Sequence, residues 1–172
     1  LMKLNSCLYL PQSMEAVQVT LEELEAHADG IICLTGGAEG PVGRLLQAGQ
    51  AARAEALLGR LASIYPDRLY VELQRHPGEG GQYTEAERAT ERGHVEIAYA
   101  MDLPLVATND VYFPTADLYE AHDALICIAE GAYVDQLEPR RRLTPQHYLK
   151  SESEMCALFA DLPEALENTV EI

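Results

Sequence analysis

Hydrophobic and polar residues form alternating blocks along the chain. Three short runs of mostly apolar residues, at 31–34, 69–73 and 103–107, are bounded by turn residues. Such runs are typical of strands that are buried on both faces of a sheet. The longer segments between them carry leucine or alanine at helical spacing, as in QAARAEALLGRLASIY. The order strand, helix, strand, helix, strand, helix predicts an α/β fold with parallel strands and outer helices.

Sequence patterns typical of helix N-termini locate the starts of several predicted helices. Thr20–Glu23, Thr84–Glu87 and Ser151–Glu154 each have the capping-box pattern, in which a hydroxyl and a carboxylate satisfy free amides of the first turn. Pro163 suits the first position of a last helix. Helices are also predicted at residues 1–9, in the region after Pro41, and at 115–129. Three strand–helix units are too few for a closed eight-stranded barrel, but they suit part of one.

The two ends of the sequence lie inside helix-like patterns. The chain begins LMKLNSCLYL and closes on LENTVEI, which has no glycine that would end a helix. We therefore expect a fragment of a longer protein. We divide it into an α/β portion at 1–142 and a helical segment at 143–172.

The charge balance restricts the class of partner. The formal net charge is −16, and the one basic cluster, residues 140–142, is short. Binding to nucleic acid depends on phosphate neutralisation by Lys and Arg, so this segment is not expected to grip DNA. The four cysteines are far apart in the sequence, as in a reduced, cytoplasmic protein. Neither a membrane-spanning run nor a leader sequence is predicted.

Candidate chemistry lies where the predicted strands end, because ligands of parallel α/β proteins bind beyond the carboxyl ends of the strands. These ends are Thr35-Gly36-Gly37, Gln74-Arg75-His76 and Thr108-Asn109-Asp110. Asp110 is the best candidate for a metal ligand, and the alternative is that it caps the next turn. Tyr112 would point to the same side, but a phenol is a poor ligand near neutral pH.

The other residues of this predicted surface give weaker signals. His76 follows a strand and precedes a loop rich in Gly and Pro, a position that allows a functional role, but a surface histidine is favoured. Gly36 and Gly37 suit close packing or a turn, since no phosphate-loop motif follows them. For His122 and Asp123, capping or packing is favoured. The residues alone therefore predict an α/β domain with an incomplete metal site at Asp110. Gly36, His76 and Asn109 belong to the possible surface formed by the strand tips.

Five segments, in order, resemble a known family: LTGGAEGPVGRLL, YPDRLYVELQRH, LPLVATNDVYF, AHDALICI and SESEMCALFADLPEALENTVEI. They are similar to the later part of the N-terminal polymerase-and-histidinol-phosphatase (PHP) domain of bacterial DNA polymerase III alpha subunits. The resemblance implies a portion of a distorted (β/α)7 barrel. It also implies that the H-x-H motif of the family precedes Leu1 and that the polymerase palm follows Ile172.

The resemblance also implies which metal ligands have been lost. Asp110 matches the aspartate of the family's N-D-x-H pattern, Tyr112 stands where the histidine would be, and Gly37 stands where metal-binding members have cysteine. This loss of donors resembles the metal-free branch of the family, in which the resemblance implies that the domain has a structural role and docks the proofreading exonuclease. No catalytic residue or cofactor is then expected here. Mg²⁺ belongs to the polymerase core of the parent, and Zn²⁺ or Mn²⁺ only to an active PHP site.

Two alternatives remain at this point. One is an active, metal-dependent phosphoesterase or 3′–5′ exonuclease, and the other is an unrelated regulatory α/β domain that binds a small molecule. A further expectation concerns assembly. Absent first strands would leave sheet edges unpaired, and unpaired edges favour self-association of the fragment.

Overall fold

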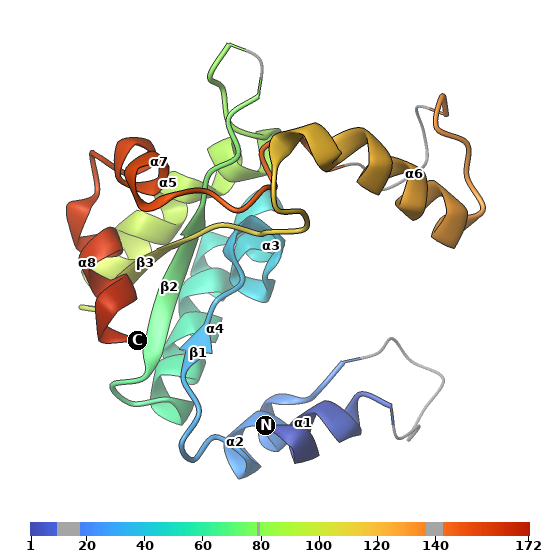
Figure 1. Ribbon diagram of the computed structural model, residues 1–172. Coiled ribbons are helices and arrows are strands. Elements are labelled where there is room, and N and C mark those ends of the chain that lie inside the picture. Colours follow the sequence, from blue (N-terminus) through green and yellow to red (C-terminus); the bar gives the residue numbers. More distant parts are fainter. Residues whose placement is uncertain (10–17, 79, 137–142) are drawn as a thin grey trace.

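The fold is known from a computed structural model that describes residues 1–9, 18–78, 80–136 and 143–172 (Figure 1). Its strands are β1 (Cys33–Leu34), β2 (Leu69–Gln74) and β3 (Leu105–Thr108). Its helices are α1 (Met2–Cys7), α2 (Leu21–Ala26), α3 (Pro41–Gln47), α4 (Ala51–Ile64), α5 (Glu85–Ala100), α6 (Tyr119–Glu130), α7 (Glu152–Leu158) and α8 (Pro163–Glu171). Two 3-10 turns, η1 (Gly37–Glu39) and η2 (Ala116–Leu118), precede α3 and α6.

The three strands form one parallel sheet in the order β1-β2-β3. This confirms the predicted α/β class and brings the carboxyl ends of the strands to one edge. The first strand is shorter than predicted. The guanidinium of Arg68 donates to the carbonyls of Ala28 at 2.8 Å and Ile31 at 3.2 Å, so the chain before Cys33 is held by a side chain.

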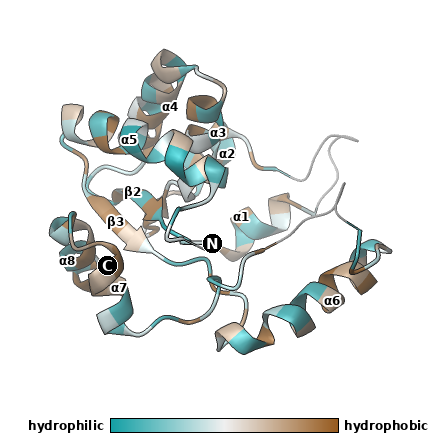
Figure 2. Cartoon of the chain, turned by 90° about the horizontal axis from the view of Figure 1, so that it is seen from above, coloured by the Kyte–Doolittle hydropathy of each residue, from teal (hydrophilic) through white to brown (hydrophobic). Residues whose placement is uncertain are grey.

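The core lies between the sheet and the helices α3, α4 and α5 (Figure 2). Side chains alternate along β2, so that Val71 and Leu73 point into this core beside Leu58 and Leu61 of α4. Glu72 lies between them in the sequence and points to the other face, at the edge where the strands end. The alternation therefore places a carboxylate under the predicted site.

The start signals of the helices are confirmed at α2, α5 and α7, where the hydroxyl and the carboxylate of each capping box both bond. The helix predicted at 115–129 begins differently. Thr115 caps no amide with its side chain, and the Leu118 amide bonds the Thr115 carbonyl at 3.1 Å. The first turn is therefore a tight 3-10 turn, and α6 begins at Tyr119.

Helices α7 and α8 pack beside β3 and share its core. Phe159 and Ala165 are fully buried in the same cluster as Val71. The side-chain amide of Asn168 donates to the Leu105 carbonyl at 2.8 Å, which covers part of the β3 backbone. The division at residue 142 stays a prediction, since 137–142, including the basic cluster, lie outside the described residues.

A buried arginine joins these helices to the end of β2. Arg75 is 3% exposed and pairs with Glu91 of α5 at 2.7 Å and with Asp161, before α8, at 2.6 Å. It also donates to the Leu158 carbonyl and lies over the Phe159 ring. The hydrogen bonds that Arg75 donates to Asp161 and then to Glu91 raise the pKa of Arg75, so this cation is permanent. The junction is thus held by charge and packing together.

Candidate functional site

Glu72 ties the ends of the three strands together. Its carboxylate accepts from the Gly36 amide at 2.8 Å and from the Thr108 hydroxyl at 2.5 Å, while its own amide donates to the Thr35 hydroxyl. Gln74 donates to the same carboxylate at 3.2 Å. Glu72 thus joins the three strand ends, and nothing in the pattern of the apolar strand around it singles it out.

Next to these strand ends lies an open pocket of about 640 Å³, which Gln74 lines but Glu72 does not. Three predicted site residues line it: His76, Asp110 and Tyr112. The others lie elsewhere. Gly36 is bound to Glu72, and the Asn109 side chain donates to the Tyr148 carbonyl at 2.6 Å and accepts from Lys150 at 3.1 Å. The strand ends therefore converge as predicted, but only part of the predicted set faces the pocket.

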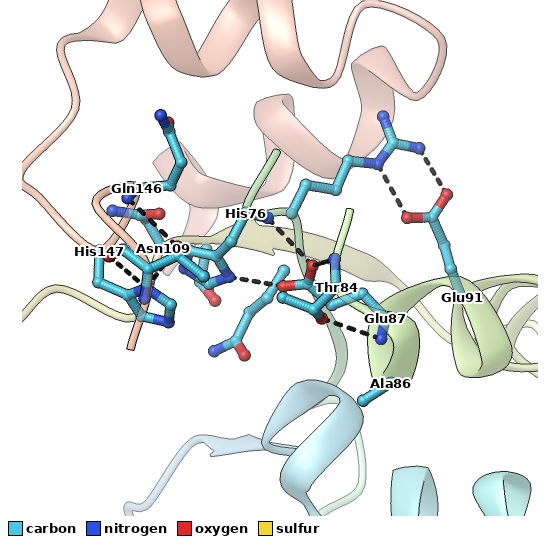
Figure 3. A network of polar contacts seen from close by, with 12 residues as sticks. His76, Thr84, Ala86, Glu87, Glu91, Asn109, Gln146 and His147 are labelled. Atoms are coloured by element: carbon cyan, nitrogen blue, oxygen red, sulfur yellow. Dashed lines mark hydrogen bonds and ion pairs between the residues drawn. The ribbon is translucent and has the colours of Figure 1, made fainter. Parts of the chain in front are cut away.

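The interpretation of His76 as a surface residue is wrong. His76 is 3% exposed, and its Nδ1 lies 2.5 Å from Oε1 of Glu87 (Figure 3). The Glu87 carboxylate also accepts from the backbone amides of His76 and Thr84. Burial works against the charge of Glu87, but the bonds from His76 and Thr84 outweigh it and lower the pKa of this carboxyl. One capping-box carboxylate thus begins α5 and orients His76.

A second histidine covers the first. The rings of His76 and His147 stack with centroids 3.9 Å apart and an interplanar angle of 4°. His147 accepts from the Thr144 amide at its Nδ1. Burial, and then the proximity of His76, lower the pKa of His147 to about 4. His147 carried no signal in the sequence because only the folding of residues 143–150 against 109–113 brings it here.

Gly37 has a backbone conformation that other residues rarely adopt. Its φ is +55°, and a Cβ at this position would lie 2.7 Å from Oε1 of Gln74. The turn interpretation of this glycine is confirmed by its place at the start of η1. A side chain reaching from position 37 toward the pocket would therefore require both a strained backbone and a displaced Gln74.

Several side chains of the pocket carry atoms that can bind a metal, and they differ in what they contact. Asp110 is half-buried and lines the pocket, whereas the Tyr112 ring makes edge contacts with His122 and His147 at centroid distances of 5.6 and 6.1 Å. His122 also packs against Phe113, so the packing interpretation of His122 is confirmed. Among the described residues, no group of three or more His, Cys, Asp or Glu side chains is arranged to hold a metal ion.

Comparison with known proteins identifies the family. Residues 1–76 match the PHP domain. The chain is 48% identical to the DNA polymerase III subunit alpha of Caulobacter vibrioides over 173 residues, which is 100% of this chain and 14% of that protein. It is 44% identical to the subunit of Pseudomonas aeruginosa and 42% identical to that of Escherichia coli, in each case over 84% of this chain and 12% of the relative. The chain belongs to the DNA polymerase III alpha-subunit family.

The family assignment confirms the resemblance seen in the sequence motifs. The chain spans only 12–14% of the length of these three polymerase III alpha subunits. The PHP match ends at His76, so the pocket combines matched residues with the loop after β3, the start of α5 and the 143–150 segment. In the part of the chain that the structure describes, none of the helices is both long and apolar enough to cross a membrane.

Proposed function

We propose that this chain is a segment of the catalytic alpha subunit of a replicative DNA polymerase, and that its PHP-type site is degenerate and holds no metal. The whole subunit then carries out DNA-directed DNA synthesis in the cytoplasm, with Mg²⁺ in a polymerase core outside this chain. The segment itself has a structural role and docks other proteins, foremost the proofreading exonuclease. DNA is contacted by other parts of the subunit, since this segment carries a formal charge of −16.

The metal-free proposal is supported by the residues at the three positions where the family resemblance predicts metal ligands. Position 37 is a glycine with positive φ, and a side chain there would meet Gln74. Position 112 is a phenol, which must lose a proton of pKa about 10 before it can bind a metal. Only Asp110 keeps a donor, and one carboxylate does not hold a transition metal.

The second candidate is an active metal-dependent phosphoesterase or exonuclease. Its support is the pocket itself, where the Nε2 atom of His76 is buried without a hydrogen-bond partner among the described residues and Asp110 is also a lining residue. A carboxylate that holds the other nitrogen of a histidine is common beside metal sites. The two candidate functions therefore differ in whether Asp110 and His76 bind a metal.

Metal analysis of the purified full-length subunit separates the two functions. We expect less than stoichiometric Zn, Mn or Fe and the same metal content in the Asp110→Ala variant. We also expect no hydrolysis of a phosphodiester or a 3′-terminus when these metals are supplied. Stoichiometric metal that is lost in Asp110→Ala, together with metal-dependent hydrolysis, would establish the second candidate instead.

A further inference from the structure

Helix α6 carries an apolar stripe that the described part of the chain leaves uncovered. The stripe begins at the N-cap, Leu118, and continues with Ala121, Leu125 and Ile128 in the helix, alternately three and four residues apart. This is the spacing at which one helix packs along another. Leu125 is 63% exposed and Ile128 is 78% exposed. Beyond the end of the helix, Tyr133 adds a ring that is 76% exposed. Exposed apolar residues that line up in this way mark binding surfaces more often than scattered ones do.

The opposite side of α6 is the side that faces the protein. Cys127 and Asp123 are buried, and His122 packs against Phe113. Figure 1 shows α6 extending away from the sheet, and Figure 2 shows the same from above. One side of α6 thus contacts the rest of the chain, and the apolar stripe faces outward.

The negative charge around the stripe indicates that the partner is basic. Residues 110–136 contain no Lys or Arg, and the exposed residues beside the stripe include Asp117, Glu120, Glu130 and Asp135. Pairing of two copies of α6 would bring these acids against each other at distances within a Debye length, which is unfavourable. A helix with basic side chains beside its apolar stripe would instead be attracted.

The position of α6 favours a separate protein over a continuation of the same chain. Ile172 lies on the opposite side of the molecule from α6 in both views. We propose that α6 is the docking surface for an amphipathic helix of another protein, with apolar residues in a heptad stripe flanked by Lys or Arg. This inference deepens the docking role proposed above and is independent of the metal content of the pocket.

The test uses this chain and a synthetic Leu/Lys peptide with leucine at the a and d positions of a heptad. We expect saturable binding and new hydrogen-exchange protection over residues 118–133. Ile128→Glu should weaken binding about tenfold or more, because it places a charge at the most exposed residue of the stripe. Val170→Glu is the matched control, since Val170 is 86% exposed on α8 and should leave binding unchanged.

Three outcomes would overturn the inference. The first is equal binding of a peptide with the same composition in scrambled order, which would show attraction by charge alone. The second is peptide protection over α7 and α8 with no effect of Ile128→Glu. The third is self-association of the chain that Ile128→Glu abolishes, which would make a second copy the occupant. None of these outcomes alters the metal analysis, so the two proposals fail separately.

Discussion

At the scale of single residues, Gly37 shows how backbone and packing can exclude a side chain together. Its positive φ alone disfavours any other residue, and Gln74 fills the space where a Cβ would project. Gly49 has a similar φ of +69°, but nothing lies within 4 Å of its Cβ position. Comparing substitutions at the two glycines therefore separates the free-energy cost of backbone strain from that of steric contact.

We predict that Gly37→Ala destabilises the chain by more than about 1 kcal/mol and by more than Gly49→Ala, as measured by urea denaturation. The difference should shrink in a Gln74→Ala background, because the contact is then removed. Equal costs for the two glycine variants would show that only backbone strain matters at position 37.

The stacked histidines predict a pH dependence of stability. The pKa of His147 is lowered from 6.5 to about 4 in the folded chain, first by burial and then by His76. As the pH falls below about 6.5, the unfolded histidine takes up a proton while the folded one stays neutral. Stability from this group is thus complete above about pH 6.5, declines down to about pH 4 and changes no further below it.

The variant His147→Asn tests this prediction, since an amide oxygen can still accept from the Thr144 amide but does not titrate. Denaturation midpoints measured from pH 7 to 4 should fall less steeply in the variant than in the unaltered chain. Parallel profiles would assign the acid sensitivity to other groups.

The sequence predicted the site residues unevenly, for a physical reason. Asp110 and Tyr112 were found because strand ends can be read from apolar runs. His76 was misjudged and His147 was missed, because their burial depends on a segment that is distant in sequence and folds back beside residues 109–113. Local patterns do not record such long-range packing.

At the scale of elements, the hydrophobic pattern was a reliable guide where local rules decide. The capping boxes and the apolar runs gave α2, α5, α7, β2 and β3 close to their observed bounds. The predicted and observed bounds differ at two places. Before β1, the Arg68 side chain bonds backbone carbonyls, and at Thr115 no side chain caps the helix start.

The junction made by Arg75 gives a prediction about how elements are joined. Arg75→Met keeps most of the side-chain volume but removes the bonds to Glu91, Asp161 and the Leu158 carbonyl. We expect a loss of roughly 2–4 kcal/mol in the free energy of unfolding, since hydrogen bonds of buried charged groups are costly to remove.

The control for that variant is Arg92→Met. Arg92 pairs with Glu96 one turn along α5, with 88% of its side chain exposed. Exposed pairs of this kind contribute about 0.5 kcal/mol or less, so this variant should unfold almost as the unaltered chain does. Similar losses for both arginines would mean that the junction adds nothing beyond a surface ion pair.

At the scale of the whole molecule, the sheet has an edge that predicts self-association. Among the residues that the structure describes, β1 pairs only with β2, and Leu34 in this strand and Ile32 just before it are 39% and 43% exposed. We propose that two copies of this chain associate through this edge, with dimers seen in sedimentation at micromolar concentration. Ile32→Lys should shift them toward monomers, whereas a monomeric unaltered chain would contradict the proposal.

The hydrogen bonds of Glu72 have a consequence for how such a site evolves. A single carboxylate crosslinks all three strand ends, so the sheet edge beside the pocket is held by hydrogen bonds of the chain itself. A position outside these bonds, such as 112, can then change its residue without loosening the sheet. A protein built in this way can abandon one chemistry and keep its shape, which leaves its outer surfaces available for new associations.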